Sequence, residues 1–100
     1  MKRIGIAVAA LAALTLTASA ASMETVAIGC SDYKDYKALV GFAVDKDRGA
    51  FMKYAVSHDC REFKAGDGVI VSDPGVMTSC IRERGNPTCY WVSNAAIKQP

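Results

Sequence analysis

The segment 57–60 reads Ser-His-Asp-Cys, and His58 is the only histidine in the chain. An imidazole beside a thiol can activate a cysteine nucleophile, so His58 and Cys60 form one candidate catalytic pair. This chemistry requires Cys60 to be a free thiol. A metal site at His58 and Asp59 lacks further ligands at suitable spacing. We interpret His58 as a loop residue beside a disulfide, and we expect no catalytic residue, no metal and no cofactor.

Aromatic and basic residues near the C-terminal end offer a different chemistry, which is recognition. Tyr90 and Trp91 are adjacent, and Trp91 is the only tryptophan. Arg82 and Arg84 flank Glu83 just before the Gly-Asn-Pro turn signal, where they would form an exposed basic tip. Aromatic and arginine side chains are enriched at protein interfaces. Our candidate binding residues are therefore Trp91, Tyr90, Arg82 and Arg84, although Trp91 is also a candidate packing anchor.

Four cysteines, Cys30, Cys60, Cys80 and Cys89, form an even set in a short chain. The close Cys-x₂-Cys pairs of structural zinc sites are missing from the sequence, so we expect two disulfides. Four cysteines allow three pairings. We favour Cys30–Cys60 with Cys80–Cys89, and Cys30–Cys80 with Cys60–Cys89 is the main rival.

Residues 1–20 have the form of a cleaved signal peptide. A basic start is followed by an apolar run and by Ala18-Ser19-Ala20, which matches a signal-peptidase site. A membrane anchor is disfavoured because the run is short and Glu24 follows it. Lipidation at Cys30 is disfavoured because it would leave an odd number of cysteines. We expect a periplasmic or secreted protein without stable membrane insertion after cleavage.

The charge balance argues against nucleic acid as a partner. The chain has 12 Lys and Arg against 10 Asp and Glu, and the leader contains two of the bases, Lys2 and Arg3, and no acid. The remaining residues, 21–100, therefore have no net charge. Since nucleic-acid binding relies on concentrated positive charge, we expect a protein or cell-wall partner instead.

The first part of the predicted domain, about residues 31–57, has helical periodicity. Ser31 or Asp32 can cap a first helix, and Asp45 or Asp47 can cap a second. Apolar residues then recur at helical spacing in both segments, which predicts a short helical hairpin or one kinked helix. The expected core face of the first helix consists of Tyr33, Tyr36, Leu39, Val40, Ala43 and Val44.

The second part, about residues 60–97, has the shorter period of strands. Turn signals at 66–68, 73–75 and 84–87 separate runs rich in Val, Ile, Thr and aromatic residues. They predict strands at about 60–63, 69–72, 76–83 and 88–92, and one helical turn at 93–97. Alternation places Met77, Ile81, Tyr90 and Val92 on the core face and Trp91 on the other. The open question is whether the helical hairpin buries Trp91.

The segments EFKAGDGVIV, TSCIRERG and CYWVSNAAI resemble bacterial SH3-like (SH3b) domains of exported proteins. The shared pattern is a glycine before a V-x-V strand, a glycine-containing turn, and an aromatic-Trp-Val ending before a small-small-aliphatic close. The resemblance begins at about Cys60 and leaves out the helical part. The matching residues are Gly66 or Gly68, Val69, Val71, Ile81, Gly85, Trp91, Val92 and Ile97.

The resemblance implies a barrel that binds peptides, cell-wall glycans or proteins. The expected fold is α+β, with an N-terminal helical hairpin followed by a small four- or five-stranded antiparallel SH3-like barrel stapled by disulfides. It would occupy residues 21–100 as a single domain. We expect a binding protein rather than an enzyme. The alternative is an inhibitor or immunity protein against an envelope-acting enzyme such as a cell-wall hydrolase.

Overall fold

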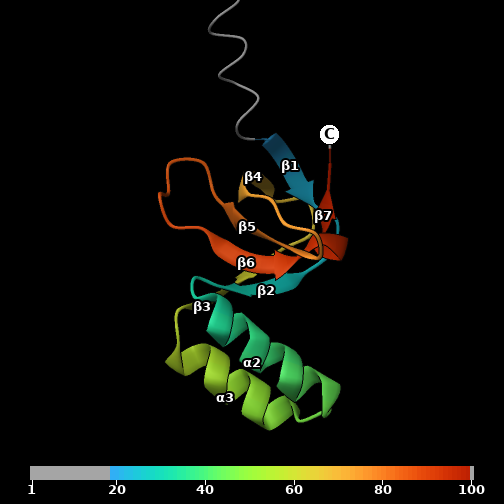
Figure 1. Ribbon diagram of the computed structural model, residues 1–100, viewed down its shortest axis with the longest axis vertical. Helices are drawn as coiled ribbons and strands as arrows, with labels where there is room; N and C mark the ends of the chain where they lie inside the picture. The colour runs from blue at the N-terminus through green and yellow to red at the C-terminus, as the bar shows by residue number, and fades with distance from the viewer. Residues whose placement is uncertain (1–18, 100) are drawn as a thin grey trace, which may run out of the picture.

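The computed structural model describes residues 19–99 (Figure 1). Most of the predicted leader, residues 1–18, lies outside this range, and its last two residues begin the first strand. The leader and its cleavage site remain predictions. The elements are, in order, β1 (Ser19–Met23), β2 (Ala27–Cys30), α2 (Tyr33–Val44), α3 (Arg48–Ser57), β3 (Cys60–Phe63), β4 (Gly68–Asp73), β5 (Thr78–Arg82), β6 (Tyr90–Ser93), the 3₁₀ turn η2 (Asn94–Ala96) and β7 (Ile97–Lys98).

The strands form one seven-stranded sheet in the order β3-β2-β6-β5-β4-β1-β7, and every neighbouring pair is antiparallel. Within residues 19–99 no ladder joins β3 to β7, so the sheet is open. The predicted fold is therefore wrong in two respects. The sheet is not a four- or five-stranded SH3-like barrel, and the helical hairpin is not N-terminal but lies between β2 and β3.

The sequence prediction missed β1 and β2 because neither has a strong strand signal. The first is Ser-Ala-Ala-Ser-Met, and the second contains Gly29. Small residues and glycine are poor strand formers, so tertiary pairing decides their state. Gly29 is required by close packing: a Cβ there would lie 2.7 Å from Val92 Cγ1 and 2.9 Å from the carbonyl oxygen of Trp91.

Local hydrogen bonds cap the start of both helices and the end of α2. The Asp32 carboxylate accepts the N–H of Lys34 (2.8 Å), and Asp47 accepts that of Ala50 (3.1 Å), so each helix has a side-chain N-cap. Lys46, two residues after the end of α2, has a left-handed backbone conformation with a φ of 58°. Its N–H donates to the carbonyl of Ala43 and that of Asp47 to Phe42, which is the Schellman arrangement.

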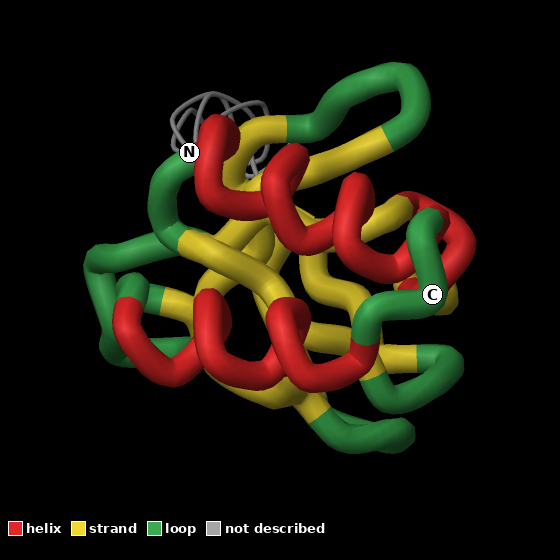
Figure 2. Tube along the Cα trace, turned by 90° about the horizontal axis from the view of Figure 1, so that it is seen from below, coloured by secondary structure: helices red, strands yellow, loops and turns green. Residues whose placement is uncertain are grey.

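The helical hairpin packs on one face of the sheet, and the main hydrophobic core lies on the other. In Figure 1 the helical hairpin lies below the strands, and the view from below in Figure 2 shows both helices running across one face of the sheet. Under the hairpin, Cys30, Leu39 and Ala55 are buried. The opposite face forms the main core, which joins residues from both ends of the strand order because the sheet bends around it. That core contains Met23, Phe63, Val69, Val71, Ile81, Tyr90, Val92, Ala96 and Ile97.

The disulfides are Cys30–Cys60 and Cys80–Cys89, the pairing that we favoured from the sequence. The first joins directly opposed residues of β2 and β3. It therefore closes the base of the helical hairpin. The second connects β5 to the segment just before β6. Among the described residues, no helix is long and apolar enough to cross a membrane.

Candidate functional site

Trp91 packs between the sheet and the helical hairpin. Its side chain lies on the face opposite the main core, where the ring of Tyr33 meets it edge-on with a centroid distance of 5.4 Å. Trp91 is only partly exposed. The hairpin therefore covers much of the tryptophan, and the exposed aromatic ring at this place is that of Tyr33.

Tyr90 faces the other way, into the main core, with 8% of its surface exposed. Its hydroxyl donates to Asp59 (3.2 Å). Burial, followed by the negative charge of Asp59 and this hydrogen bond, raises the pKa of Tyr90. The Arg61 guanidinium lies 5.8 Å from the Tyr90 ring centroid and forms a two-pronged ion pair with Glu83 (2.9 and 3.0 Å). These contacts hold Tyr90 as a structural residue.

The two candidate arginines lie at the end of β5 and in the loop that follows. Arg82 is partly buried and approaches the carbonyl oxygen of Asn86 at 3.5 Å, whereas Arg84 is exposed. Since Tyr90 and Trp91 point to opposite faces of the sheet, the four candidate residues do not share one surface.

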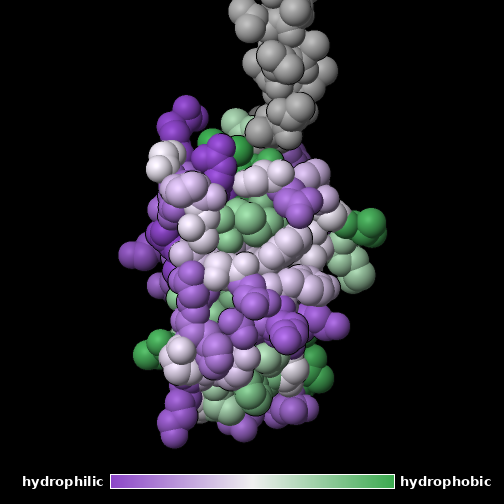
Figure 3. All heavy atoms as spheres, turned by 60° about the vertical axis from the view of Figure 1, so that its left-hand side comes forward, coloured by the Kyte–Doolittle hydropathy of each residue, from purple (hydrophilic) through white to green (hydrophobic). Residues whose placement is uncertain are grey.

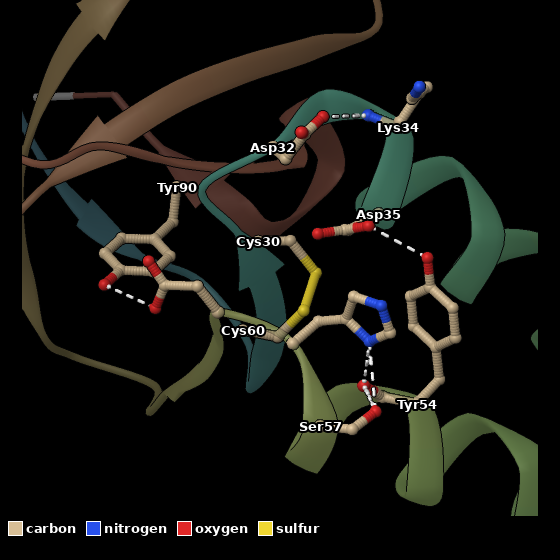
Figure 4. Close-up of a disulfide and its surroundings, with 10 residues drawn as sticks. Cys30, Asp32, Lys34, Asp35, Tyr54, Ser57, Cys60 and Tyr90 are labelled. Carbon is tan, nitrogen blue, oxygen red and sulfur yellow. Dashed lines mark hydrogen bonds between the residues drawn. A yellow bond between two sulfur atoms is a disulfide. The ribbon is translucent and has the colours of Figure 1, made fainter.

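The His58 ring is bound to the end of α3. It stacks on the Tyr54 ring at 3.8 Å, and its Nδ1 lies 2.9 Å from the carbonyl oxygen of Tyr54. The Tyr54 hydroxyl donates to Asp35 of the neighbouring helix (2.9 Å), which raises the pKa of Tyr54 (Figure 4). Because Cys60 is bonded to Cys30, the candidate Cys–His pair has no thiol here.

A more extended feature is an apolar groove of about 290 Å³ between α2 and the β4–β5 loop. One wall comes from α2 and the other from the end of the loop and the strands β5 and β6. We call it the α2–loop groove. Its lining residues are Tyr33, Tyr36, Lys37, Val40, Met77, Thr78 and Ser93.

Hydrogen bonds from one asparagine fix the loop wall of the groove. The Asn94 Nδ2 donates to the carbonyl oxygens of Gly75 (2.9 Å) and Val76 (3.0 Å), and its backbone N–H donates to Met77 (2.9 Å). The buried Ser79 hydroxyl donates to Asn94 Oδ1 (2.6 Å) and accepts the N–H of Gly75 (3.2 Å). A Cβ on Gly75 would clash with the carbonyl oxygen of Thr78. The loop backbone is therefore tightly constrained.

This constrained loop nevertheless exposes apolar side chains. Val76 is 97% exposed and Met77 78%. On α2, Tyr33, Val40 and Val44 are also exposed, and their spacing of seven and four residues places them along one helix face. Figure 3 shows hydrophobic side chains standing out at the margins of the surface, bordered by hydrophilic residues.

A second hollow, of about 340 Å³, lies at the tip of the helical hairpin. Phe42 and Phe51 supply its apolar lining, and Lys46, Asp47 and Arg48 surround it with both signs of charge. Both of its walls belong to the hairpin, and it lacks the loop network described above. The α2–loop groove is therefore the stronger candidate site.

The sequence prediction placed Val76 and Met77 inside a strand at about 76–83 and put Met77 on its core face. This is wrong for Met77, which is exposed. The strand starts only at Thr78. The available signal was the preceding Asp-Pro-Gly turn, which extends two residues further because Asn94 binds it. Tyr33, Val40 and Val44 of α2 were predicted as core residues, but they are exposed. The apolar face of α2 is wider than the part of the helix that packs on the sheet and on α3.

Comparisons of the chain with protein-family models, curated proteins and solved structures found no match.

Proposed function

We propose that this protein is an exported, disulfide-bonded binding protein that contacts a protein partner through the α2–loop groove and the adjoining side chain of Val76. The observation that carries the proposal is the combination of exposed apolar side chains with a constrained backbone at Val76 and Met77. A large exposed apolar surface is unfavourable in water unless a partner covers it.

The rigidity of the loop also supports binding. A flexible loop loses conformational entropy when a partner orders it, and this loss weakens the complex. Asn94 keeps the β4–β5 loop in one conformation before binding. The apolar contacts of Val76 and Met77 are then available with little ordering cost.

Export is supported by the leader pattern of residues 1–20 and by the disulfides. Two bridges suit an oxidising compartment outside the cytoplasm, because thiols remain reduced inside it. The partner would then be a periplasmic, secreted or envelope protein.

The alternative of an enzyme inhibitor is favoured by the same loop. Val76 is almost fully exposed on a hydrogen-bonded loop, and a rigid projecting loop can enter the cleft of an enzyme. A simple binding protein and an enzyme inhibitor differ in the partner that they bind and in whether binding stops the partner's activity. Both use the same surface.

The test is affinity capture from a periplasmic extract with the oxidised domain as bait, comparing three variants. Val76→Ser with Met77→Ser removes the apolar contacts, and Asn94→Ala loosens the loop without changing either side chain. Val56→Ser is the matched control, since Val56 is 82% exposed on α3. We expect one stoichiometric partner with the native and control baits, at least tenfold less with the double variant, and an intermediate amount with Asn94→Ala.

Equal capture by the double variant and the native domain would refute the proposal. Where the captured partner is a cell-wall hydrolase, its activity against purified peptidoglycan is measured with and without the domain. Loss of activity at equimolar domain identifies an inhibitor, and unchanged activity identifies a simple binding partner.

A further inference from the structure

The charges around the α2–loop groove bear on the kind of segment that it binds. Among the described residues that line the groove, Lys37 alone is charged. Its Nζ lies 5.8 Å from the centroid of the Tyr33 ring, on the exposed side of α2. Within residues 19–99 no carboxylate lines the groove. The lining therefore has a positive charge, although residues 21–100 together have no net charge.

The acidic residues nearest in sequence to Lys37 are occupied elsewhere. Asp32 accepts the backbone N–H of Lys34 as the N-cap of α2. Asp35 lies on the side of α2 that faces α3 and accepts the hydroxyl of Tyr54. Among residues 19–99 the ion pair found is Arg61–Glu83, which involves a different part of the molecule. The ammonium of Lys37 therefore has no acidic partner within the described domain.

The size of the groove limits the part of the partner that it holds. Pockets for drug-sized ligands span about 300–1,000 Å³, and the groove, at about 290 Å³, lies just below that range. One or two side chains fit, and the surrounding exposed residues Val44 and Val76 extend the apolar surface beyond the groove. A free small molecule in the groove would leave both of these uncovered, whereas a chain segment would run on across them.

We infer that the α2–loop groove binds an acidic-apolar peptide segment of the partner protein, with an apolar side chain between Val40 and Met77 and an adjacent carboxylate on Lys37. This inference rests on the proposed function and specifies the partner's chemistry. The apolar anchor supplies most of the contact, since burial of apolar surface is favourable. The carboxylate selects among apolar segments, because an exposed ion pair adds only a little affinity.

The test uses three acetylated, amidated peptides that differ at one position. Each has a leucine–phenylalanine pair preceded by aspartate, asparagine or lysine. Binding is measured by the chemical shifts of the backbone amides and by the fluorescence of Trp91, which contacts the groove residue Tyr33. We expect the aspartate peptide to bind about three- to fivefold more tightly than the asparagine peptide, and the lysine peptide to bind weakest. Shifts should centre on Tyr33, Val40 and Met77.

Lys37→Gln should abolish the difference between the aspartate and asparagine peptides while leaving the affinity for the asparagine peptide unchanged. Lys34→Gln is the control, since Lys34 is an exposed lysine of the same helix that does not line the groove. It should keep the difference.

Three results would overturn the inference without deciding the proposed function, which the capture assay tests separately. They are equal affinities for the three peptides, a preference for aspartate that survives Lys37→Gln, and no shift at the groove with any peptide. A dimer mass in light scattering, with shifts at the groove that depend on protein concentration alone, would show that a second copy covers it and would also overturn the inference.

Discussion

Trp91 was a candidate both for binding and for packing, and its surroundings favour packing. Its ring lies against Tyr33 of α2, so it joins the helical hairpin to the sheet. We predict that Trp91→Ala lowers the free energy of unfolding by about 2–4 kcal/mol, because it leaves a cavity at this contact. Urea denaturation followed by far-ultraviolet circular dichroism measures the change. The control Val56→Ala should stay within about 0.5 kcal/mol of the native domain.

If Trp91→Ala left stability unchanged and abolished partner binding, Trp91 would be a contact residue instead of a packing anchor.

Tyr90 gives a prediction for alkaline pH. Its pKa is raised in the folded state, chiefly by burial, so the folded protein keeps the phenolic proton more tightly than the unfolded chain. This contribution to stability is complete below about pH 10, the ordinary tyrosine pKa, and is lost as the pH rises through the raised value. Tyr90→Phe should therefore weaken the loss of stability that sets in as the pH rises above about 10.

The measurement is the urea midpoint across that pH range. At pH 7 the same variant should lose about 0.5–1.5 kcal/mol, the usual contribution of one hydrogen bond, here the one to Asp59. Tyr36 and Tyr54, whose pKa values are also raised, should leave a residual alkaline effect. Identical pH slopes for native and variant would contradict the role of Tyr90.

The turn that follows α2 contains a lysine, Lys46, in a backbone conformation that favours glycine. Lys46 has a φ of 58°, a region in which glycine has no steric penalty. We predict that Lys46→Gly raises the free energy of unfolding by about 0.5–1 kcal/mol. The control Lys53→Gly, inside α3, should lower it by about 1 kcal/mol. If Lys46→Gly also lowered the midpoint of thermal unfolding, the prediction would be wrong. The contacts of the Lys46 side chain would then stabilise the domain by more than its left-handed backbone conformation destabilises it.

The helices and strands also differ in how well they could be predicted from their own sequences. The helices could be predicted because Asp32 and Asp47 are strong N-caps in front of helical periodicity. The strand β3 was predicted with its observed bounds. The short strands β1, β2 and β7 could not be, since their residues become strands only through pairing with distant segments. The α2–loop groove could not be predicted for the same reason: its walls come from residues 33–40 and 77–93, which meet only in the folded domain.

At the scale of the whole molecule, the two disulfides close loops of different length. Cys30 and Cys60 are 30 residues apart, and Cys80 and Cys89 are nine apart. The loop-entropy model gives about 3.5 kcal/mol for the first and about 2.5 kcal/mol for the second. We therefore predict that replacing the pair Cys30 and Cys60 by alanine destabilises the domain more than replacing Cys80 and Cys89. Urea denaturation of the two double variants compares them, and the reverse order would contradict the prediction.

Features that depend on neighbouring residues could be predicted from the sequence: the candidate N-caps of both helices, the periodicity of the hairpin, the turn signals and the orientation of Ile81, Tyr90 and Val92 toward the core. The sequence also favoured the observed disulfide pairing. The strand order, the place of the hairpin between β2 and β3, the contact that covers Trp91 and the exposure of Met77 became clear from the folded structure alone. These depend on contacts between residues far apart in the chain, such as Asn94 with Gly75, whose free energy has no counterpart in local propensity.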